Sequence, residues 1–451
     1  MKTYETLLRR VLWPAYEGGL RRRDTPRHMR RYEREQWLAP KEIQALQFER
    51  LKRLLDWCYR EVPFYRRRWD ALGIAPRDIR SMDDYAKLPV LTKADIREHA
   101  DDLKATSLKA SLSYKATGGS TGEPLRFGYT RESNDRRVAV MWRGYGWAGS
   151  RMGRRTLFLW GGAVGDPTKS HQMKDRIYNA VFARKLLDSF RMSEATMADY
   201  ADAIDAYRPE VIVAYVGPLV RLAEWLIAEG RQVARPASII GAAEALHPFQ
   251  REIVERAFGA PAFNTYGCRE FMLIASECEH RDGLHINADH LVVETLDGQG
   301  LPTHTGSGEV AITDLFNYGM PFIRYVNGDM ATPSTARCPC GRGLPMLASV
   351  DGRKLDAIRT PAGHVLPGEF FPHMLKDVPG LTRFQLVQRR LDRLDLSIVR
   401  GNDFEDASLD YIRREVAKVL GDSAELHCHF VDDIPLTRSG KLRVTVSELV
   451  P

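Results

Sequence analysis

A short segment rich in glycine and hydroxyl residues is the first part of the chain whose residue types suit chemistry. Residues 114–130 read YKATGGSTGEPLRFGYT, with strand-like residues on both sides of the glycines. Glycine lets the backbone turn through positive φ and bring its N–H groups close to a ligand, and hydroxyls add uncharged donors, so this loop suits phosphate. The alternative is a solvated turn, which such clusters commonly form. The candidate phosphate-binding residues are Thr117, Gly118, Gly119, Ser120, Thr121 and Gly122.

The same loop excludes one class of nucleotide-binding protein. A P-loop ATPase needs glycine, then lysine, then serine or threonine, whereas this chain has Gly122-Glu123-Pro124. If the loop binds phosphate, a group other than that lysine must supply the positive charge.

A second candidate segment, residues 264–271, follows a strand-like stretch and reads NTYGCREF. The ring of Tyr266 can stack on a purine, and Gly267 lets a base approach the backbone. The carboxylate of Glu270 is the hard oxygen ligand that Mg²⁺ prefers. The alternative is an ordinary turn between a strand and a loop.

Cysteine and histidine residues form a third candidate group. Cys278, Cys338 and Cys340, together with His280 or His285, offer the four thiolate and imidazole ligands that suit tetrahedral Zn²⁺. Free thiols in a tight turn are the alternative, and the sequence does not decide between the two histidines. The two cysteines that fall within apolar patterns are expected to be buried small residues: Cys58 and Cys428.

Length and composition indicate a globular protein with more than one domain. The chain has 451 residues, which is more than a single hydrophobic core usually holds. Its residues are 44% hydrophobic and 28% charged, which is ordinary for a globular protein. Its net charge of +7 is concentrated near the amino end, for example at 21–23 and 66–68. Aromatic interleaving there is weak, which favours a solvated arginine-rich face over a nucleic-acid site. The chain shows neither an apolar run of membrane-spanning length nor a secretory signal, so we expect a cytoplasmic protein.

Hydrophobic periodicity predicts the order of the elements. A helix over 43–62 is followed, after the glycine loop, by a helix over 133–147 and then by alternating strands and helices. This alternation predicts a largely parallel α/β sheet. Short strands near 291–295 and 309–313 indicate a β-rich subdomain, and the last hundred residues indicate a compact α+β domain. The alternating elements are a strand at 157–160, a helix at 194–207, a strand at 211–216, a helix at 218–229, a strand at 238–240 and a helix at 248–258.

Several motifs in a fixed order carry a resemblance to a known family. The first two motifs are PFY at 63–65 and LPVLTKAD at 88–95, and the glycine loop and the segment around 266 follow them. The last three are PFIRYVNGD at 321–329, GRKLD at 352–356 and PLTRSGKLR at 435–443. Their order and spacing resemble the phenylacetate–coenzyme A ligase family of adenylate-forming enzymes, which includes CapK-like members. The resemblance covers nearly all of residues 40–445.

This resemblance implies an α/β fold with two unequal domains. The large N-terminal adenylate-forming domain, with several subdomains and parallel sheets, would occupy residues 1–353 and include the β-rich subdomain around 285–350. A small α+β mobile lid domain would occupy residues 354–451. The hinge position would be Leu355, where the family usually has a polar residue.

The resemblance also implies roles for individual residues. The glycine loop would hold the β- and γ-phosphates, and Lys441 would meet the substrate carboxylate and the α-phosphate. Arg269 stands where the family usually has a threonine that meets the α-phosphate, and an arginine can make a charge-assisted contact to the same group. Glu270 would hold Mg²⁺. The remaining nucleotide-binding residues would be Glu244, Tyr266, Gly267, Asp329 and Arg353.

The implied activity is a two-step ligation that uses ATP and Mg²⁺. A carboxylic acid, expected to be aromatic, is activated as an acyl-adenylate and passed to coenzyme A. The alternatives are an amine, amino acid or carrier-protein acceptor, or a non-catalytic nucleotide-binding relative. Because similar cysteines in the family are sometimes metal-bound, the resemblance favours a structural Zn²⁺ held by Cys278, His285, Cys338 and Cys340.

Three further expectations concern partners. The acid pocket would come from residues 142–164, 213–217 and 241–244, where Tyr145, Trp147 and Trp160 would permit an aryl acid. The arginines of the amino end could meet the phosphates of coenzyme A. Nucleic acid is not an expected partner, and the oligomeric state is open, a homodimer included.

Overall fold

A computed structural model describes most of the chain. The described residues are 2–116, 125–161, 173, 177–353, 358–361, 365–366, 370–375, 378–420, 424–435 and 443–449. The glycine loop at 117–122, Leu355 and Lys441 lie outside these ranges, so the predictions made for them remain predictions from sequence.

Within the described ranges, eleven strands form one mixed sheet in the order β10-β11-β12-β13-β9-β8-β7-β6-β5-β3-β4. The five strands from β7 to β4 are parallel, and the rest pair antiparallel. The parallel strands are β3 (Thr156–Trp160), β4 (Arg184–Asp188), β5 (Val211–Tyr215), β6 (Ser238–Ala242) and β7 (Ala262–Tyr266). The antiparallel strands are β8 (Ala275–Glu277), β9 (Leu284–Ile286), β10 (Leu291–Leu296), β11 (Gly308–Asp314), β12 (Tyr325–Ser334) and β13 (Met346–Arg353).

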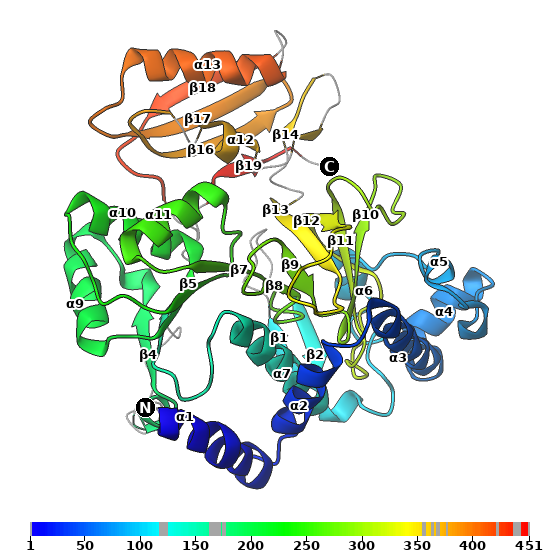
Figure 1. Cartoon of the computed structure of the whole chain (residues 1–451). Helices are drawn as coiled ribbons and strands as arrows, with labels where there is room; N and C mark the ends of the chain where they lie inside the picture. The colour runs from blue at the N-terminus through cyan, green and yellow to red at the C-terminus, as the bar shows by residue number, and fades with distance from the viewer. Residues whose placement is uncertain are drawn as a thin grey trace.

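Helices cover both faces of the parallel strands, as Figure 1 shows. Alternate residues of β5 face opposite sides of the sheet. Ile212 and Ala214 pack with residues of α9 (Met197–Tyr207), α10 (Val216–Ala228) and α11 (Pro248–Phe258). Val211 and Val213 pack instead with Tyr145 of α7 (Arg131–Trp147). Burial on both faces explains why β5 reads VIVAY, a continuous apolar run.

The antiparallel strands share a core with the first long helices. Leu51, Leu54 and Cys58 of α3 (Pro40–Glu61) are fully buried in it, together with residues of α4 (Pro63–Ala71) and of the hairpin formed by β1 (Ser113–Ala116) and β2 (Arg126–Tyr129). The short helices α5 (Met82–Tyr85) and α6 (Lys93–Glu98) lie between α4 and this hairpin in the chain. Because β8 and β9 join the antiparallel strands to β7, the β-rich region continues the parallel sheet instead of forming a sheet of its own.

A second sheet of four strands lies at the carboxyl end, at the top of Figure 1. Its order is β18-β17-β16-β19, and residues of α13 pack on it around Leu386, Leu396 and Val416. Cys428 of β18 is only half-buried, so the expectation that it is a buried residue is wrong. The elements of this region are β14 (Ile358–Arg359), β15 (Val365–Leu366), α12 (Phe370–Leu375), β16 (Leu381–Arg390), β17 (Arg393–Arg400), α13 (Asp406–Leu420), β18 (Glu425–Phe430) and β19 (Thr445–Ser447).

The periodicity predicted most elements of the α/β region to within a few residues, and the structure adds an N-terminal set that it did not predict. That set is α1 (Lys2–Leu7), two short π-helical stretches at Leu8–Leu12 and Ala15–Leu20, and α2 (Thr25–Glu35). The edge strand β4 was also not predicted. In the described part of the chain, no helix combines the length and apolar character needed to cross a membrane.

Candidate active site

The carboxyl ends of four parallel strands meet at one edge of the large sheet. Trp160 ends β3, Tyr215 ends β5, Ala242 ends β6 and Tyr266 ends β7. The rings of Trp160 and Tyr215 lie 4.2 Å apart, centroid to centroid. Because ligands of open α/β sheets bind beyond the carboxyl ends of the strands, this edge is the candidate active site.

Asp329 is held at this edge by two side chains. Tyr266 Oη donates a hydrogen bond of 2.9 Å to Asp329 Oδ2, and Asn327 Nδ2 donates to the same oxygen at 2.5 Å. Asn327 Nδ2 also lies 2.9 Å from Tyr266 Oη, and its Oδ1 accepts the backbone N–H of Asp329 at 3.0 Å. Burial, and then the charge of Asp329, raise the pKa of Tyr266 well above its ordinary value, so its phenol remains a donor.

The strand pairing places two predicted ribose-binding residues opposite each other. Asp329 of β12 and Arg353 of β13 are partners in the antiparallel register. The arrangement therefore brings together residues from β7, β12 and β13, of which Tyr266 and Arg353 are 87 positions apart in the chain.

Glu270 lies against the same strand. Its side chain is buried, and Oε1 accepts a hydrogen bond of 3.1 Å from Tyr325 Oη, four residues before Asp329 on β12. Burial, and then the negative charge of Glu270, raise the pKa of Tyr325 far above its usual range. The neighbouring Arg269 is exposed. A buried carboxylate whose position is fixed by a tyrosine beside the Asp329 cluster fits the predicted Mg²⁺ ligand.

The structure gives a steric reason for glycine at position 267 that the sequence did not reveal. A Cβ atom at this position would come within 2.0 Å of the carbonyl oxygen of Met272, whose own φ is +68°. The glycine therefore permits a tight turn after β7. Its predicted contact with a base, and the predicted stacking of Tyr266 on a purine, remain predictions.

Glu244 links two neighbouring strand ends. Its Oε2 accepts a hydrogen bond of 2.7 Å from the backbone N–H of Gly217, which follows β5. Burial raises the pKa of Tyr215, and the charges of Arg269 and Glu244 then act on it in opposite directions. The side chains of Tyr215, Glu244 and Arg269 are therefore near one another at the edge of the sheet.

Lys115 of β1 is a candidate that sequence reasoning missed. Its Nζ donates to Asn134 Oδ1 at 3.1 Å and lies 4.6 Å from the centre of the Tyr129 ring. Burial, followed by the charges of Arg137 and Arg269, lowers the pKa of Lys115 to about 8. A lysine two residues before the glycine loop was the available signal, since that loop itself contains no lysine.

The predicted metal ligands form a compact cluster. One ligand atom from each of Cys278, His285, Cys338 and Cys340 lies within 4.8 Å of the others. The Sγ atoms of Cys278 and Cys338 are 3.5 Å apart, and Cys340 Sγ lies 3.4 Å from His285 Nε2. Burial lowers the pKa of His285 to about 4, so the ring is neutral at pH 7, which is its ligating form.

The fold also decides between the two candidate histidines. His280 is exposed and is not in the cluster, whereas His285 is buried and its Nδ1 lies 3.4 Å from the Leu344 carbonyl oxygen. Three thiols and one imidazole within this distance fit a tetrahedral, structural Zn²⁺, and the carbonyl would orient the ring.

One sequence expectation about the acid pocket does not hold. Trp147 lies beside His285, with ring centroids 5.6 Å apart, and not at the carboxyl ends of the strands, so it does not line the acid pocket. The arginines at 21–23 precede α2 in the N-terminal segment, which Figure 1 places opposite the C-terminal sheet, and their expected contact with coenzyme A stays a prediction. Residues 162–164 of the expected pocket lie outside the described ranges.

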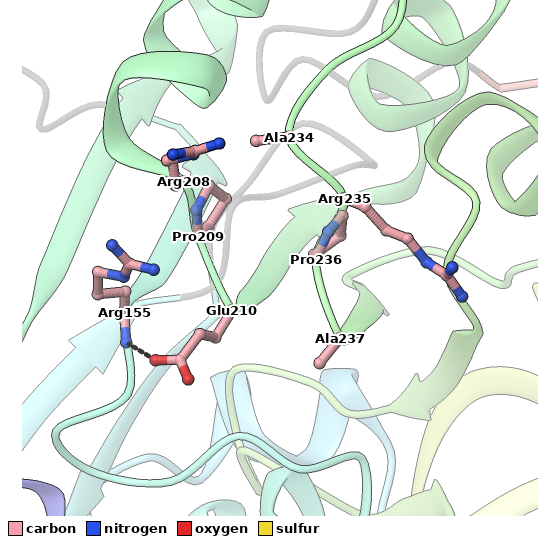
Figure 2. Close-up of a pocket in the computed structure, with 8 residues that line it drawn as sticks. All are labelled: Arg155, Arg208, Pro209, Glu210, Ala234, Arg235, Pro236 and Ala237. Atoms are coloured by element: carbon pink, nitrogen blue, oxygen red, sulfur yellow. Dashed lines mark hydrogen bonds between the residues drawn. The ribbon is translucent and has the colours of Figure 1, made fainter. Parts of the chain in front are cut away.

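A separate cavity of about 520 Å³ lies at the other edge of the parallel strands (Figure 2). Arg155 precedes β3, Glu210 precedes β5 and Ala237 precedes β6. In Figure 2 the Arg235 side chain points away from Arg155. The cavity is thus at the amino ends of the strands and contains none of the candidate site residues.

Comparison with known proteins gives the family. A phenylacetate–coenzyme A ligase of Thermus thermophilus is 30% identical over 447 residues, covering 91% of this chain and 98% of that protein. The chain belongs to the phenylacetate–coenzyme A ligase family. The predictions of the family and of an acid–thiol ligase are therefore confirmed.

Further comparisons extend the family assignment. The model of the CapK C-terminal domain matches residues 358–448. The protein CapK of Staphylococcus aureus is 23% identical over 374 residues, and the alignment covers 80% of this chain and 80% of that protein. A crystal structure of 2-hydroxyisobutyryl-CoA ligase with an acyl-AMP, in its post-adenylation state, superimposes with a TM-score of 0.76 at 20% identity and 92% coverage of both chains. The predicted adenylate-forming fold is confirmed, whereas the exact domain boundary at 353/354 stays a prediction.

Proposed function

We propose that the protein activates a carboxylic acid with ATP as an acyl-adenylate and then transfers the acyl group to coenzyme A. The gathering of Tyr266, Glu270 and Asp329 at the carboxyl ends of the parallel strands, in a chain of this family, carries the proposal. Asp329 would accept hydrogen bonds from the ribose hydroxyls, because its carboxylate is already oriented by Tyr266 and Asn327.

In the first step the substrate carboxylate oxygen attacks the α-phosphorus of ATP and pyrophosphate leaves. Arg269 and Lys441 would bind the oxygens that carry the negative charge. Glu270 would hold Mg²⁺, which supplies positive charge to the triphosphate. Tyr325 would keep Glu270 in place through its hydrogen bond.

In the second step the thiolate of coenzyme A attacks the acyl carbon and AMP leaves. The C-terminal domain carries Lys441, and its rotation between the steps would withdraw this lysine from the site and admit the acceptor. An aryl acid is the proposed substrate class, because the rings of Trp160 and Tyr215, in contact at 45° to each other, lie at the strand ends and can pack against an aromatic acyl group.

The Zn²⁺ assigned to Cys278, His285, Cys338 and Cys340 has a structural role in this proposal. The four ligands join the residue after β8 and the middle of β9 to the segment before β13. The ion would stabilise the antiparallel part of the sheet that carries Asp329, without contacting the reacting groups.

The test is a two-stage assay with purified protein. A panel of aromatic and aliphatic acids is first incubated with ATP and Mg²⁺, and acid-dependent pyrophosphate release is measured. AMP and acyl thioester are then measured with coenzyme A. We expect at least one acid to give both products. Release of AMP that does not respond to coenzyme A would contradict the thioester step, and no acid-dependent pyrophosphate release would favour a non-catalytic nucleotide-binding protein.

A second acceptor class is favoured by the match to the CapK C-terminal domain. Amines, amino acids and a carrier protein are therefore included in the second stage. An amide or carrier-bound product, formed in preference to the thioester, would replace coenzyme A as the acceptor while leaving the adenylation step intact.

A further inference from the structure

The helical segment of residues 2–13 carries apolar residues on both of its faces. On the inner face, Leu8 and Trp13 are buried in a small core with Met152 and Phe182. On the outer face, Leu7 is 47% exposed and Val11 is 53% exposed. A surface helix normally presents polar residues to water. Packing within this molecule therefore explains Leu8 and Trp13, but it does not explain Leu7 and Val11.

A second exposed apolar segment lies beside this helix. Tyr4 Oη donates a hydrogen bond of 2.7 Å to the carbonyl oxygen of Val181, so the two segments are in contact although they are far apart in sequence. Ile177 is 58% exposed and Val181 is 40% exposed. Exposed apolar residues that gather from separate segments mark an interaction surface. We call this surface the N-terminal edge and define it by Tyr4, Leu7, Val11, Ile177 and Val181.

The charges around the N-terminal edge are positive. Arg10, Arg21 and Arg22 of the same segment are exposed. The two acidic residues of residues 2–23 are paired: Glu5 with Arg154 at 3.4 Å and Glu17 with Arg23 at 3.6 Å. Residues 2–23 contain five arginines against these two glutamates, so the segment keeps an excess of positive charge.

We propose that the N-terminal edge binds peripherally to the surface of an anionic lipid bilayer. Leu7 and Val11 would enter the headgroup region, and Arg10, Arg21 and Arg22 would meet lipid phosphates. Apolar side chains flanked by arginines are the combination that favours such an interface. A second copy of the chain is the less suitable occupant, because a symmetric contact brings the same arginines together without carboxylates to balance them.

The position of the N-terminal edge is compatible with catalysis at the membrane surface. Figure 1 shows α1 at the end of the molecule opposite the four-stranded C-terminal sheet. Binding through α1 therefore leaves the C-terminal domain on the side that faces away from the bilayer.

The experiment is co-sedimentation of the full-length protein with lipid vesicles. Vesicles of phosphatidylcholine alone are compared with vesicles containing phosphatidylglycerol, at low and high salt. We expect binding to the anionic vesicles that weakens as salt increases. The variant Leu7→Glu/Val11→Glu and the variant Arg10→Glu/Arg22→Glu should each reduce the bound fraction several-fold.

Matched controls come from exposed residues that follow α4. Leu72→Glu removes a leucine that is 53% exposed, and Arg77→Glu/Arg80→Glu makes the same change of charge at exposed arginines. Both should bind vesicles as the unmodified protein does, and circular dichroism of every variant checks the fold. Equal binding of all variants, or no binding to anionic vesicles, would overturn the proposal. Light scattering measures the oligomeric state of each variant. If the protein does not bind vesicles and forms a dimer that only Leu7→Glu/Val11→Glu abolishes, the surface binds a second copy of the chain instead.

Discussion

The phenol of Tyr266, at the end of β7, donates its hydrogen bond to Asp329 on β12, 2.9 Å away. This bond connects the last parallel strand to the antiparallel part of the sheet. It fixes one carboxylate oxygen of Asp329 within the candidate active site.

Removing this donor should weaken ATP binding. In Tyr266→Phe, Asp329 loses a charge-assisted hydrogen bond, which costs about 1.5–3 kcal/mol in typical cases, so we expect the KM for ATP to rise by about ten-fold or more. The measurement is acid-dependent pyrophosphate release against ATP concentration. The control is Tyr59→Phe, which removes a similar bond, from Tyr59 Oη to Asp70 at 2.6 Å, on the exposed surface. An unchanged KM in Tyr266→Phe would contradict the role given to Asp329.

The hydrogen bond from Tyr325 to Glu270 predicts an effect on Mg²⁺. Outer partners of metal ligands typically contribute about 10–100-fold to metal affinity, so Tyr325→Phe should raise the Mg²⁺ concentration needed for half-maximal activity by about that factor. Tyr85→Phe is the control, because Tyr85 is equally buried and bonds Thr313 at 2.7 Å. A shift of the same size in both variants would indicate general destabilisation and would contradict the assignment of Glu270 as a Mg²⁺ ligand.

The lowered pKa of Lys115 predicts a pH dependence. Since its pKa is about 8, the ammonium form is present below pH 8 and is lost above it. If Lys115 supplies the charge that the glycine loop lacks, the KM for ATP should rise between pH 7 and 9. In Lys115→Met the KM should be high throughout this range, whereas the exposed Lys109→Met should behave as the unmodified protein. A pH profile that is identical in Lys115→Met would exclude this role.

The same shift has a consequence for stability. The ordinary value is 10.5 and the value in the folded protein is about 8, so the unfolded chain binds more protons between these two pH values. The contribution of Lys115 to the free energy of unfolding therefore increases as the pH rises from 8 to 10.5. Denaturant titrations across this window should show a smaller increase for Lys115→Met, and an equal increase would contradict the lowered pKa.

The cysteine cluster predicts one Zn²⁺ per chain. Elemental analysis of the purified protein should detect the metal, and Cys338→Ser should lose most of it and unfold at a lower temperature. Cys428→Ser should retain the metal, because Cys428 lies in β18, outside the cluster. Equal metal content in both variants would show that the cluster does not bind the ion.

The parallel part of the fold could be predicted from local patterns because each element has a clear signature. Runs such as VIVAY at 211–215 and the apolar stripe of α3 follow from burial on two faces of a strand and one face of a helix. The helical segment of residues 2–13 lacks such a stripe, since apolar residues such as Leu8 and Val11 lie on opposite faces, and periodicity therefore did not reveal it. The edge strand β4 reads RKLLD and is only partly buried, so its pattern is also weak.

The amino-acid sequence by itself determined the family, the order of the motifs and the residue types of the site, because these are properties of adjacent residues. Tertiary structure decided which distant residues meet: His285 and not His280 in the cysteine cluster, Tyr266 and Asn327 on Asp329, and Trp147 beside the cluster instead of in the acid pocket. The physical reason is that strand order and register set these contacts. Both depend on how the whole sheet packs against its helices, which no local pattern records.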